Sequence, residues 1–259
     1  MAMMLSVAAV LAIHGEVLFG QVFVFADPFV HPPWTALAPA GGSGLPRMMA
    51  DWVRYTHPAW ELAHQELSRG RLPLWNPHVF CGHDHAGSLQ PAVFSPIRSA
   101  FGLLPPATGL SLYVLFHACL AAAGTALFLR GRRSTIVAAV TGAAVLTFSG
   151  YLLSKLGQPT TLATGAWLPW LVWGADRWWR RGSWRTAGLL ALLAAVCFLS
   201  GHVQVFVLVV MAVGLFLLGS VLRGNVARIP VRRRVVQGLV VALLGLGMVA
   251  PQLVAFWRS

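Results

Sequence analysis

The sequence contains few charged residues and very few carboxylates. Only 10% of its 259 residues are charged, and seven are Asp or Glu. By contrast, 57% are hydrophobic and the mean hydropathy is +0.70, with repeated apolar runs of about twenty residues. A soluble core does not need that much apolar sequence, whereas membrane-spanning helices do. The composition excludes an ordinary soluble domain and predicts an all-α, polytopic transmembrane helix bundle.

Paired cysteines and nucleotide-binding loops are also absent. Cys81, Cys119 and Cys197 have no paired spacing, which predicts neither a disulfide framework nor a thiolate metal site. Without a phosphate-binding loop or a dinucleotide fingerprint, a nucleotide-sugar donor on a Rossmann domain is not expected. The net charge of +12 would suggest nucleic acid for a soluble protein. Basic connectors between membrane spans explain it here, so no nucleic-acid partner is expected.

The apolar segments predict seven spans. Twelve of the nineteen basic residues lie in the connectors after the second, fourth and sixth of them, and this alternation follows the positive-inside rule. We therefore expect a single membrane domain, residues 1–259, in a cytoplasmic membrane, with the N-terminus cytoplasmic and residues 26–107 forming a large extracytoplasmic loop. The predicted spans are residues 3–25, 108–129, 135–153, 161–175, 184–199, 203–222 and 235–257.

The predicted outer loop holds most of the titratable chemistry, with five of the seven carboxylates and six of the nine histidines. Residues 47–69 have a helical apolar period, and Pro58 either begins a second helix or kinks the first. Gly70 closes this segment. An amphipathic pair of helices on the membrane surface is expected, followed by a proline-punctuated turn at residues 72–77.

A longer pattern crosses this loop. Asp51, Tyr55 and Pro58 precede a charged helix ending in Arg69-Gly70, and the run Leu72–Pro77 (LPLWNP) follows it. The pattern resembles the first outer loop of YfhO-type bacterial membrane proteins, which are placed with the GT-C class of glycosyltransferases. Since family members are commonly longer, the chain resembles an N-terminal part of one. Further matches are Gly82, Gln90, Ser95-Pro96, Phe148-Ser149-Gly150, Trp167-Leu168-Pro169, Gly201-His202-Val203-Gln204 and Pro251-Gln252-Leu253.

The chain also departs from the family pattern at two places. The family usually has proline where Val203 stands, and a Gly-x-Pro after the Asn-Pro where this chain has Gly82-His83-Asp84.

The resemblance implies a GT-C-like fold and hexosyl transfer from a polyprenyl-phosphate-linked sugar to a cell-envelope glycan acceptor, at the outer face and in contact with membrane lipid. A carboxylate in the first outer loop would act as general base, with Asp51 the first choice, Asp84 the second and Asp27 the third. A cation would stabilise the lipid phosphate. The candidate substrate-binding residues are Arg54, Tyr55, Trp75, Asn76, Gln90, Arg98, Lys155, His202 and Gln204.

No cofactor is expected. The sequence from His78 to His85 gathers imidazole, thiol and carboxylate groups, but it lacks a recognised zinc spacing, so a divalent metal is the less favoured alternative.

Several of these residues also have structural interpretations. Asp51 could serve only as a helix cap, because aspartate is favoured at helix starts. Arg54 could simply pair with Asp51 on a solvated face. His202 and Gln204 could close a tight turn between helices.

Two other classes of function stay open. A transporter or flippase of a lipid or solute is supported by His14 and Glu16, which lie within the first apolar segment. A non-catalytic, truncated GT-C-like subunit is suggested by the end of the sequence at Ser259, in or just after a hydrophobic helix.

Overall fold

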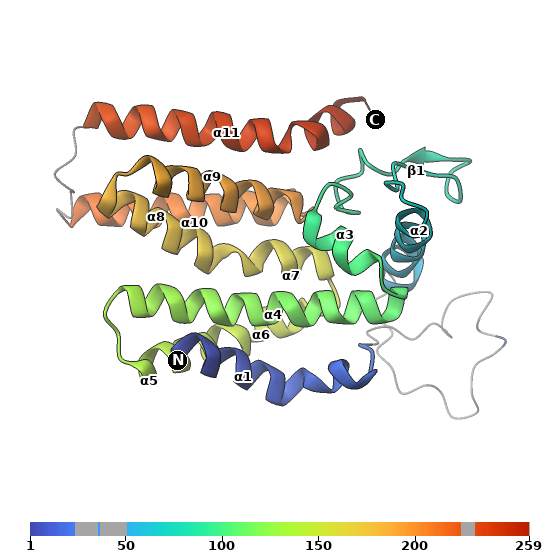
Figure 1. The fold of residues 1–259 in the computed structure, drawn as a ribbon, viewed down its shortest axis with the longest axis horizontal. Helices are drawn as coiled ribbons and strands as arrows, with labels where there is room; N and C mark the ends of the chain where they lie inside the picture. The colour runs from blue at the N-terminus through green and yellow to red at the C-terminus, as the bar shows by residue number, and fades with distance from the viewer. Residues whose placement is uncertain (24–35, 37–50, 224–230, 259) are drawn as a thin grey trace.

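A computed structural model describes residues 1–23, 36, 51–223 and 231–258, and these residues are mostly helical (Figure 1). α1 (Ala2–His14) continues into a 3-10 helix, η1 (Gly15–Phe19). Before α4 the chain forms a π-helical turn, η4 (Trp52–Thr56), then α2 (His57–Ser68), strands β1 (Trp75–Asn76) and β2 (His83–Asp84), and α3 (Pro96–Gly102). The remaining helices are α4 (Pro106–Gly131), α5 (Ile136–Thr147), α6 (Gly150–Ser154), α7 (Pro159–Ala166), α8 (Leu168–Arg181), α9 (Trp184–Leu199), α10 (Val203–Leu222) and α11 (Val231–Arg258).

Five helical segments of the described residues are long and apolar enough to cross a membrane, and they indicate a membrane-embedded protein. They coincide with five of the seven predicted spans. Of the other two, residues 184–199 form the shorter apolar helix α9, and residues 161–175 are divided at Trp167 between α7 and α8. The division falls where Pro169 enters the first turn of α8, a position that proline favours. The five segments are Ala2–Phe19, Pro106–Gly131, Ile136–Ser154, Val203–Leu222 and Arg232–Arg258.

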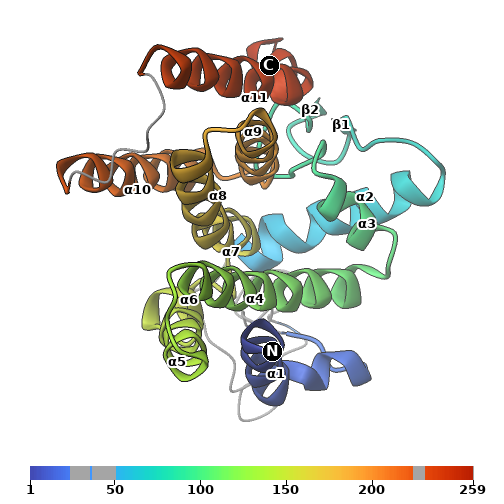
Figure 2. The same cartoon turned by 60° about the vertical axis from the view of Figure 1, so that its left-hand side comes forward.

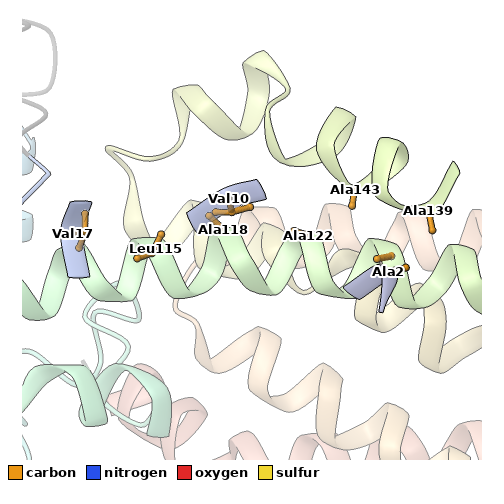
Figure 3. Packing of buried hydrophobic residues seen from close by; sticks show 9 residues of the cluster. Ala2, Val10, Val17, Leu115, Ala118, Ala122, Ala139 and Ala143 are labelled. Carbon is orange, nitrogen blue, oxygen red and sulfur yellow. The ribbon is translucent and has the colours of Figure 1, made fainter. Parts of the chain in front are cut away.

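The central helix is α4, which contacts α1, α3, α5, α7 and α8 (Figure 1, Figure 2). Small side chains form its contact with α1 and α5, as Figure 3 shows. Small residues let helix backbones approach closely, and this close packing drives helix association in lipid, where the hydrophobic effect does not. The buried members of this cluster are Ala2, Val10, Val17, Leu115, Ala118, Ala122, Ala126, Ala139 and Ala143.

Helices α10 and α11 lie at the other side of the bundle. α11 packs on α9, and α10 packs mainly on α7 and α8. Both leave rows of large apolar side chains exposed, among them Leu208 and Leu215 on α10 and Leu239 and Leu243 on α11. Exposed apolar faces of this extent are typical of helices that contact lipid.

The two ends of the bundle differ in charge. α4, α8 and α10 end, and α11 begins, at one end (Figure 1), so the terminal arginines of these helices lie there: Arg130, Arg180, Arg181 and 232–234. At this end the buried carboxylate of Asp176 forms ion pairs with Arg132 at 3.0 Å and with Arg180 at 2.7 Å. The opposite end carries α2, α3 and the β1–β2 strands. This separation of the basic connectors is what the positive-inside rule predicts, while the orientation in a membrane stays a prediction.

The segment between η1 and α4 confirms the expected helix over its described part. η4 and α2 follow one another, and Pro58 lies in the first turn of α2. Residues 72–77 are not helical, as expected, but they include β1, which pairs antiparallel with β2. Gly82 permits this hairpin, because its φ is +104° and a Cβ there would lie 2.6 Å from the Trp75 ring. Asp27 and residues 47–50 lie outside the described residues.

Candidate functional site

A cavity of about 540 Å³ lies at the end of the bundle that carries α2 and α3. Five parts of the chain meet around it: η4 with α2, the loop before α3 with α3 itself, α4, the connection into α7, and the connection before α10. Of the candidates named from the sequence, Asp51, Tyr55, Gln90, Arg98 and His202 line it. The full lining is Asp51, Tyr55, Thr56, Ala59, Trp60, Gln90, Pro91, Arg98, Tyr113, Gly157, Gln158, Pro159, Thr160, Thr161 and His202.

Arg98 is the buried cation of this cavity. Ser95 caps the start of α3 by accepting a hydrogen bond from the Arg98 backbone N–H, and this fixes the residue on the first turn. Arg98 is 4% exposed; its guanidinium carbon lies 3.4 Å from the centre of the Trp60 ring, and its Nη2 donates to the Ala59 carbonyl at 3.4 Å. Among the described residues, Nη1 has no hydrogen-bond partner and no carboxylate pairs with Arg98.

Burial lowers the pKa of Arg98 to about 9, and the neighbouring Tyr113 and Tyr55 oppose that shift. The guanidinium is therefore still charged at neutral pH. A buried charge without an opposite partner is costly for a folded protein. Binding an anion in the cavity would relieve that cost.

Two tyrosines add neutral donors beside Arg98. The Tyr113 hydroxyl is buried and, within the described part of the chain, has no hydrogen-bond partner. Tyr55 is half-buried, and burial raises its pKa to about 12, so its hydroxyl stays protonated at neutral pH. A guanidinium with two phenol hydroxyls offers an anion several hydrogen bonds of good strength.

Asp51 is exposed at the edge of the cavity, immediately before η4. Its side chain makes no capping hydrogen bond to the helix that follows. The capping interpretation of Asp51 therefore has no support in the structure. No ion pair joins Asp51 to Arg98, so within the described residues the cavity presents a carboxylate and a cation as separate groups.

Gln90 and His202 lie in two segments that contact each other closely beside the cavity, the loop before α3 and the α9–α10 turn. Gly201 has a φ of +94°, and a Cβ on it would lie 2.8 Å from the Leu89 carbonyl oxygen. Only glycine allows the α9–α10 turn to approach the 88–92 loop so closely. His202 caps α10, with its Nδ1 accepting from the Val205 N–H at 3.4 Å, and burial lowers its pKa. His202 thus closes the interhelical turn and lines the cavity at once.

The remaining candidates do not line the cavity. Asn76 and Asp84 stabilise turns at the hairpin, since Asn76 Oδ1 accepts from the His78 N–H and Asp84 Oδ1 accepts from the Gly87 N–H, each at 2.9 Å. Lys155 donates from Nζ to Oε1 of the lining residue Gln158 at 3.1 Å. The other three are surface residues: Arg54 in η4, Trp75 in β1 and Gln204 in the first turn of α10.

Several lining residues were not among the sequence candidates, notably Trp60, Tyr113, Gln158 and Thr161. Trp60 and Tyr113 lie on apolar helix faces, where an aromatic residue is normally part of the core. One signal was present, however, for Gln158 and Thr161. They lie in or next to the connector at 154–160, which the basic residues assign to the same side of the membrane as the 26–107 segment.

The His78–His85 sequence was the candidate for a metal. The rings of His83 and His85 lie 6.0 Å apart, and His85 is buried with neither ring nitrogen bonded to another described residue. Within the described ranges, no three His, Cys, Asp or Glu side chains come together as a metal ion would require. The proposal below includes no metal.

Comparison with protein-family models, with curated proteins and with solved structures finds no match to this chain. The fold and the cavity define a class, a membrane-embedded helical protein with a polar cavity at one end of the bundle. Any more specific function has to be inferred from the cavity itself.

Proposed function

We propose that this protein transfers a sugar from a polyprenyl-phosphate-linked donor to a cell-envelope glycan acceptor. One observation carries the proposal: Asp51, which makes no capping bond to η4, and Arg98, a buried cation that pairs with no carboxylate of the described residues, line the same cavity. Glycosyl transfer from a lipid phosphate needs these two groups, a base for the acceptor hydroxyl and a cation for the departing phosphate.

The reaction uses the two groups at opposite ends of one displacement. The Asp51 carboxylate takes the proton of the acceptor hydroxyl, and the acceptor oxygen forms a bond to the anomeric carbon. The bond from that carbon to the phosphate oxygen breaks, and its electron pair leaves with the lipid phosphate. Arg98, with the hydroxyls of Tyr55 and Tyr113, stabilises the charge on the phosphate. A single displacement inverts the anomeric configuration.

The position of the cavity fits a lipid-borne donor. Tyr113 lies in the second turn of α4, Pro159 and Thr160 begin α7, and His202 caps α10. The cavity therefore lies where apolar helices start, at the depth where a lipid phosphate meets the membrane surface. Helix N-termini carry partial positive charge, so the starts of α7 and α10 also favour an anion here.

The finer assignments belong to the same proposal. The chain has seven spans in a GT-C-like arrangement, with α9 and the α7–α8 pair as the two short ones. The N-terminus lies on the cytoplasmic side of a bacterial cytoplasmic membrane, and the cavity opens to the outer side. Membrane lipid surrounds the exposed faces of α10 and α11.

The test is sugar transfer by the purified chain in lipid nanodiscs, supplied with radiolabelled polyprenyl-phosphate hexose and an envelope-glycan acceptor. Asp51→Asn is expected to abolish transfer while donor binding persists. Asp84→Asn is the matched control, because that carboxylate already bonds within a turn. Transfer by Asp51→Asn at the wild-type rate would remove Asp51 from the mechanism.

The two alternatives predict different outcomes in the same nanodiscs. A flippase or transporter would move the lipid without forming a glycosidic bond, and Glu16→Gln rather than Asp51→Asn would abolish its activity. Neither Glu16 nor His14 lines the cavity, so the cavity geometry does not favour transport. A non-catalytic subunit would bind polyprenyl phosphate through Arg98 and transfer nothing.

A further inference from the structure

Helix α11 carries two fully buried glutamines on an otherwise apolar and largely exposed surface. Gln237 is 0% exposed and Gln252 is 2% exposed. A buried amide is costly unless it is hydrogen-bonded, so each glutamine marks a fixed contact between α11 and the rest of the protein. The two contacts lie at opposite ends of the helix.

Gln252 contacts the polar segment far away in the sequence. Its Nε2 donates to the Ala86 carbonyl oxygen at 2.6 Å, across 166 residues of sequence. Figures 1 and 2 both show the C-terminal end of α11 beside the segment that carries the β strands. Ala86 is buried and lies two residues after β2, at the start of the loop that leads to Gln90 and Pro91.

This loop has an energetically unfavourable backbone. Leu89 has a φ of +54° and Ala92 a φ of +53°, in the left-handed region that residues with a Cβ rarely adopt. Within the loop, the Ala92 N–H donates to the Leu89 carbonyl at 2.9 Å, a bond between residues only three apart in the sequence. Such conformations persist only where the surrounding structure holds them.

Two elements hold the loop from different sides. The α9–α10 turn contacts the loop at Gly201, where a Cβ would lie 2.8 Å from the Leu89 carbonyl oxygen and 3.2 Å from the Gln90 carbonyl oxygen. α11 holds it through the hydrogen bond from Gln252 to Ala86. Between these two contacts, the loop presents Gln90 and Pro91 to the cavity.

We infer that Gln252 is a positioning residue: through the Ala86 carbonyl it holds the 86–92 loop in the conformation that places Gln90 and Pro91 in the cavity wall. Its effect on catalysis rests on the proposed function, whereas its effect on the loop does not. Gln252 itself does not line the cavity, so it acts only through the loop.

Gln237 provides a matched control on the same helix. Its Nε2 donates to the Gly182 carbonyl at 2.9 Å, and its Oε1 accepts from Trp178 Nε1 at 3.1 Å. It is the same residue type, equally buried, and it also bonds a backbone carbonyl. That carbonyl belongs to the α8–α9 turn at the other end of the bundle.

The first measurement is backbone amide hydrogen exchange of the full chain in nanodiscs. Gln252→Met keeps the side-chain volume and removes the donor, and Gln252→Ala is the second variant. We expect both to speed exchange of the hydrogen-bonded Ala92 and Ser95 amides about tenfold, because a buried carbonyl loses its partner. Gln237→Met is expected to leave these amides unchanged and to speed exchange around Gly182. Unchanged loop exchange in both Gln252 variants, or an equal increase in Gln237→Met, would overturn the inference.

The second measurement is steady-state transfer by the same variants. A displaced cavity wall should raise KM for the lipid donor several-fold more than it lowers kcat, while Gln237→Met should change neither. Faster loop exchange with no transfer by any form, wild type included, would refute the proposed function and leave the positioning role intact. Wild-type transfer together with unchanged loop exchange would refute only the positioning role.

Discussion

Each end of the bundle buries one charged side chain, and the two side chains differ in whether the described residues pair them with an opposite charge. At the arginine-rich end, Asp176 has 10% of its side chain exposed and pairs with Arg132 and Arg180, whose side chains are 38% and 47% exposed. At the cavity end, Arg98 is buried as deeply, but none of the described residues offers it a carboxylate. The carboxylate that shares its cavity, Asp51, stands apart from it.

Under the proposed function, the difference separates a structural charge, Asp176, from a ligand-binding one, Arg98. Asp176 joins the end of α4 to α8, and its two arginines complete its interactions, so no ligand is needed there. The guanidinium of Arg98 keeps its charge, and its Nη1 has no hydrogen-bond partner among the described residues, so it could bind an anion from outside the protein.

Replacing aspartate by asparagine should lower the transfer rate at the cavity end and the stability at the arginine-rich end. Asp51→Asn should lower the transfer rate by about a thousandfold, the usual contribution of a general base, without changing thermal stability. Asp176→Asn should lower the free energy of unfolding by about 2 kcal/mol, because two arginines lose their partner, while the folded protein keeps its transfer rate. Transfer assays and tryptophan-monitored thermal unfolding measure both. A large loss of stability in Asp51→Asn would assign that carboxylate a structural role.

Acid should destabilise the cavity end through His85. Burial lowers the pKa of His85 to about 4, and the charges of His83 and Arg98 lower it too, whereas Asp84 opposes this. Because the unfolded chain binds the proton first, stability should fall as the pH drops from about 6.5 to about 4, by on the order of 3 kcal/mol, and then level off.

Thermal unfolding across this pH range measures the effect of His85. His85→Phe should flatten the acid dependence, since a phenyl ring does not titrate. His78→Gln, at an exposed histidine in the same hairpin, should keep the wild-type profile. An unchanged acid slope in His85→Phe would show that another group causes it.

Removing the uncompensated cation should weaken anion binding. Arg98→Gln should reduce affinity for polyprenyl phosphate roughly 30-fold, equivalent to about 2 kcal/mol, because charge-assisted hydrogen bonds to the phosphate are lost. Titration of the purified variants with polyprenyl phosphate measures this. Arg132→Gln, which removes an arginine from the Asp176 cluster, should bind as the wild type does. Equal weakening by both would point to a general effect of net charge.

The smallest effect concerns the turn that brings His202 to the cavity. Gly201→Ala should cost about 1 kcal/mol more than Gly70→Ala, because a Cβ at Gly201 meets the Leu89 carbonyl while none of the described atoms lies within 4 Å at Gly70. Both positions have a positive φ, so the comparison isolates the close contact. Equal unfolding free energies for the two variants would mean that the 88–92 loop can move away without loss.

Apolar periodicity and composition determined the helical architecture and five of the candidate spans, because local patterns of apolar residues decide which segments suit a membrane. The polar 26–107 segment also identified Asp51 and Arg98 as candidates. The resemblance ranked Asp51 above Asp84, which the structure places in a turn, but it did not separate Arg98 from Arg54, which lies outside the cavity lining.

The sequence by itself therefore determined the class of protein and the part of the chain that holds most of its carboxylates and histidines. Only the tertiary structure decided that Tyr113, Gln158 and His202, from three distant segments, share a cavity with Arg98, and that Asp176 rather than Arg98 has its charge compensated. The physical reason is that hydropathy is local along the chain. Whether a buried charged side chain is paired with an opposite charge depends on contacts between helices that are far apart in the sequence.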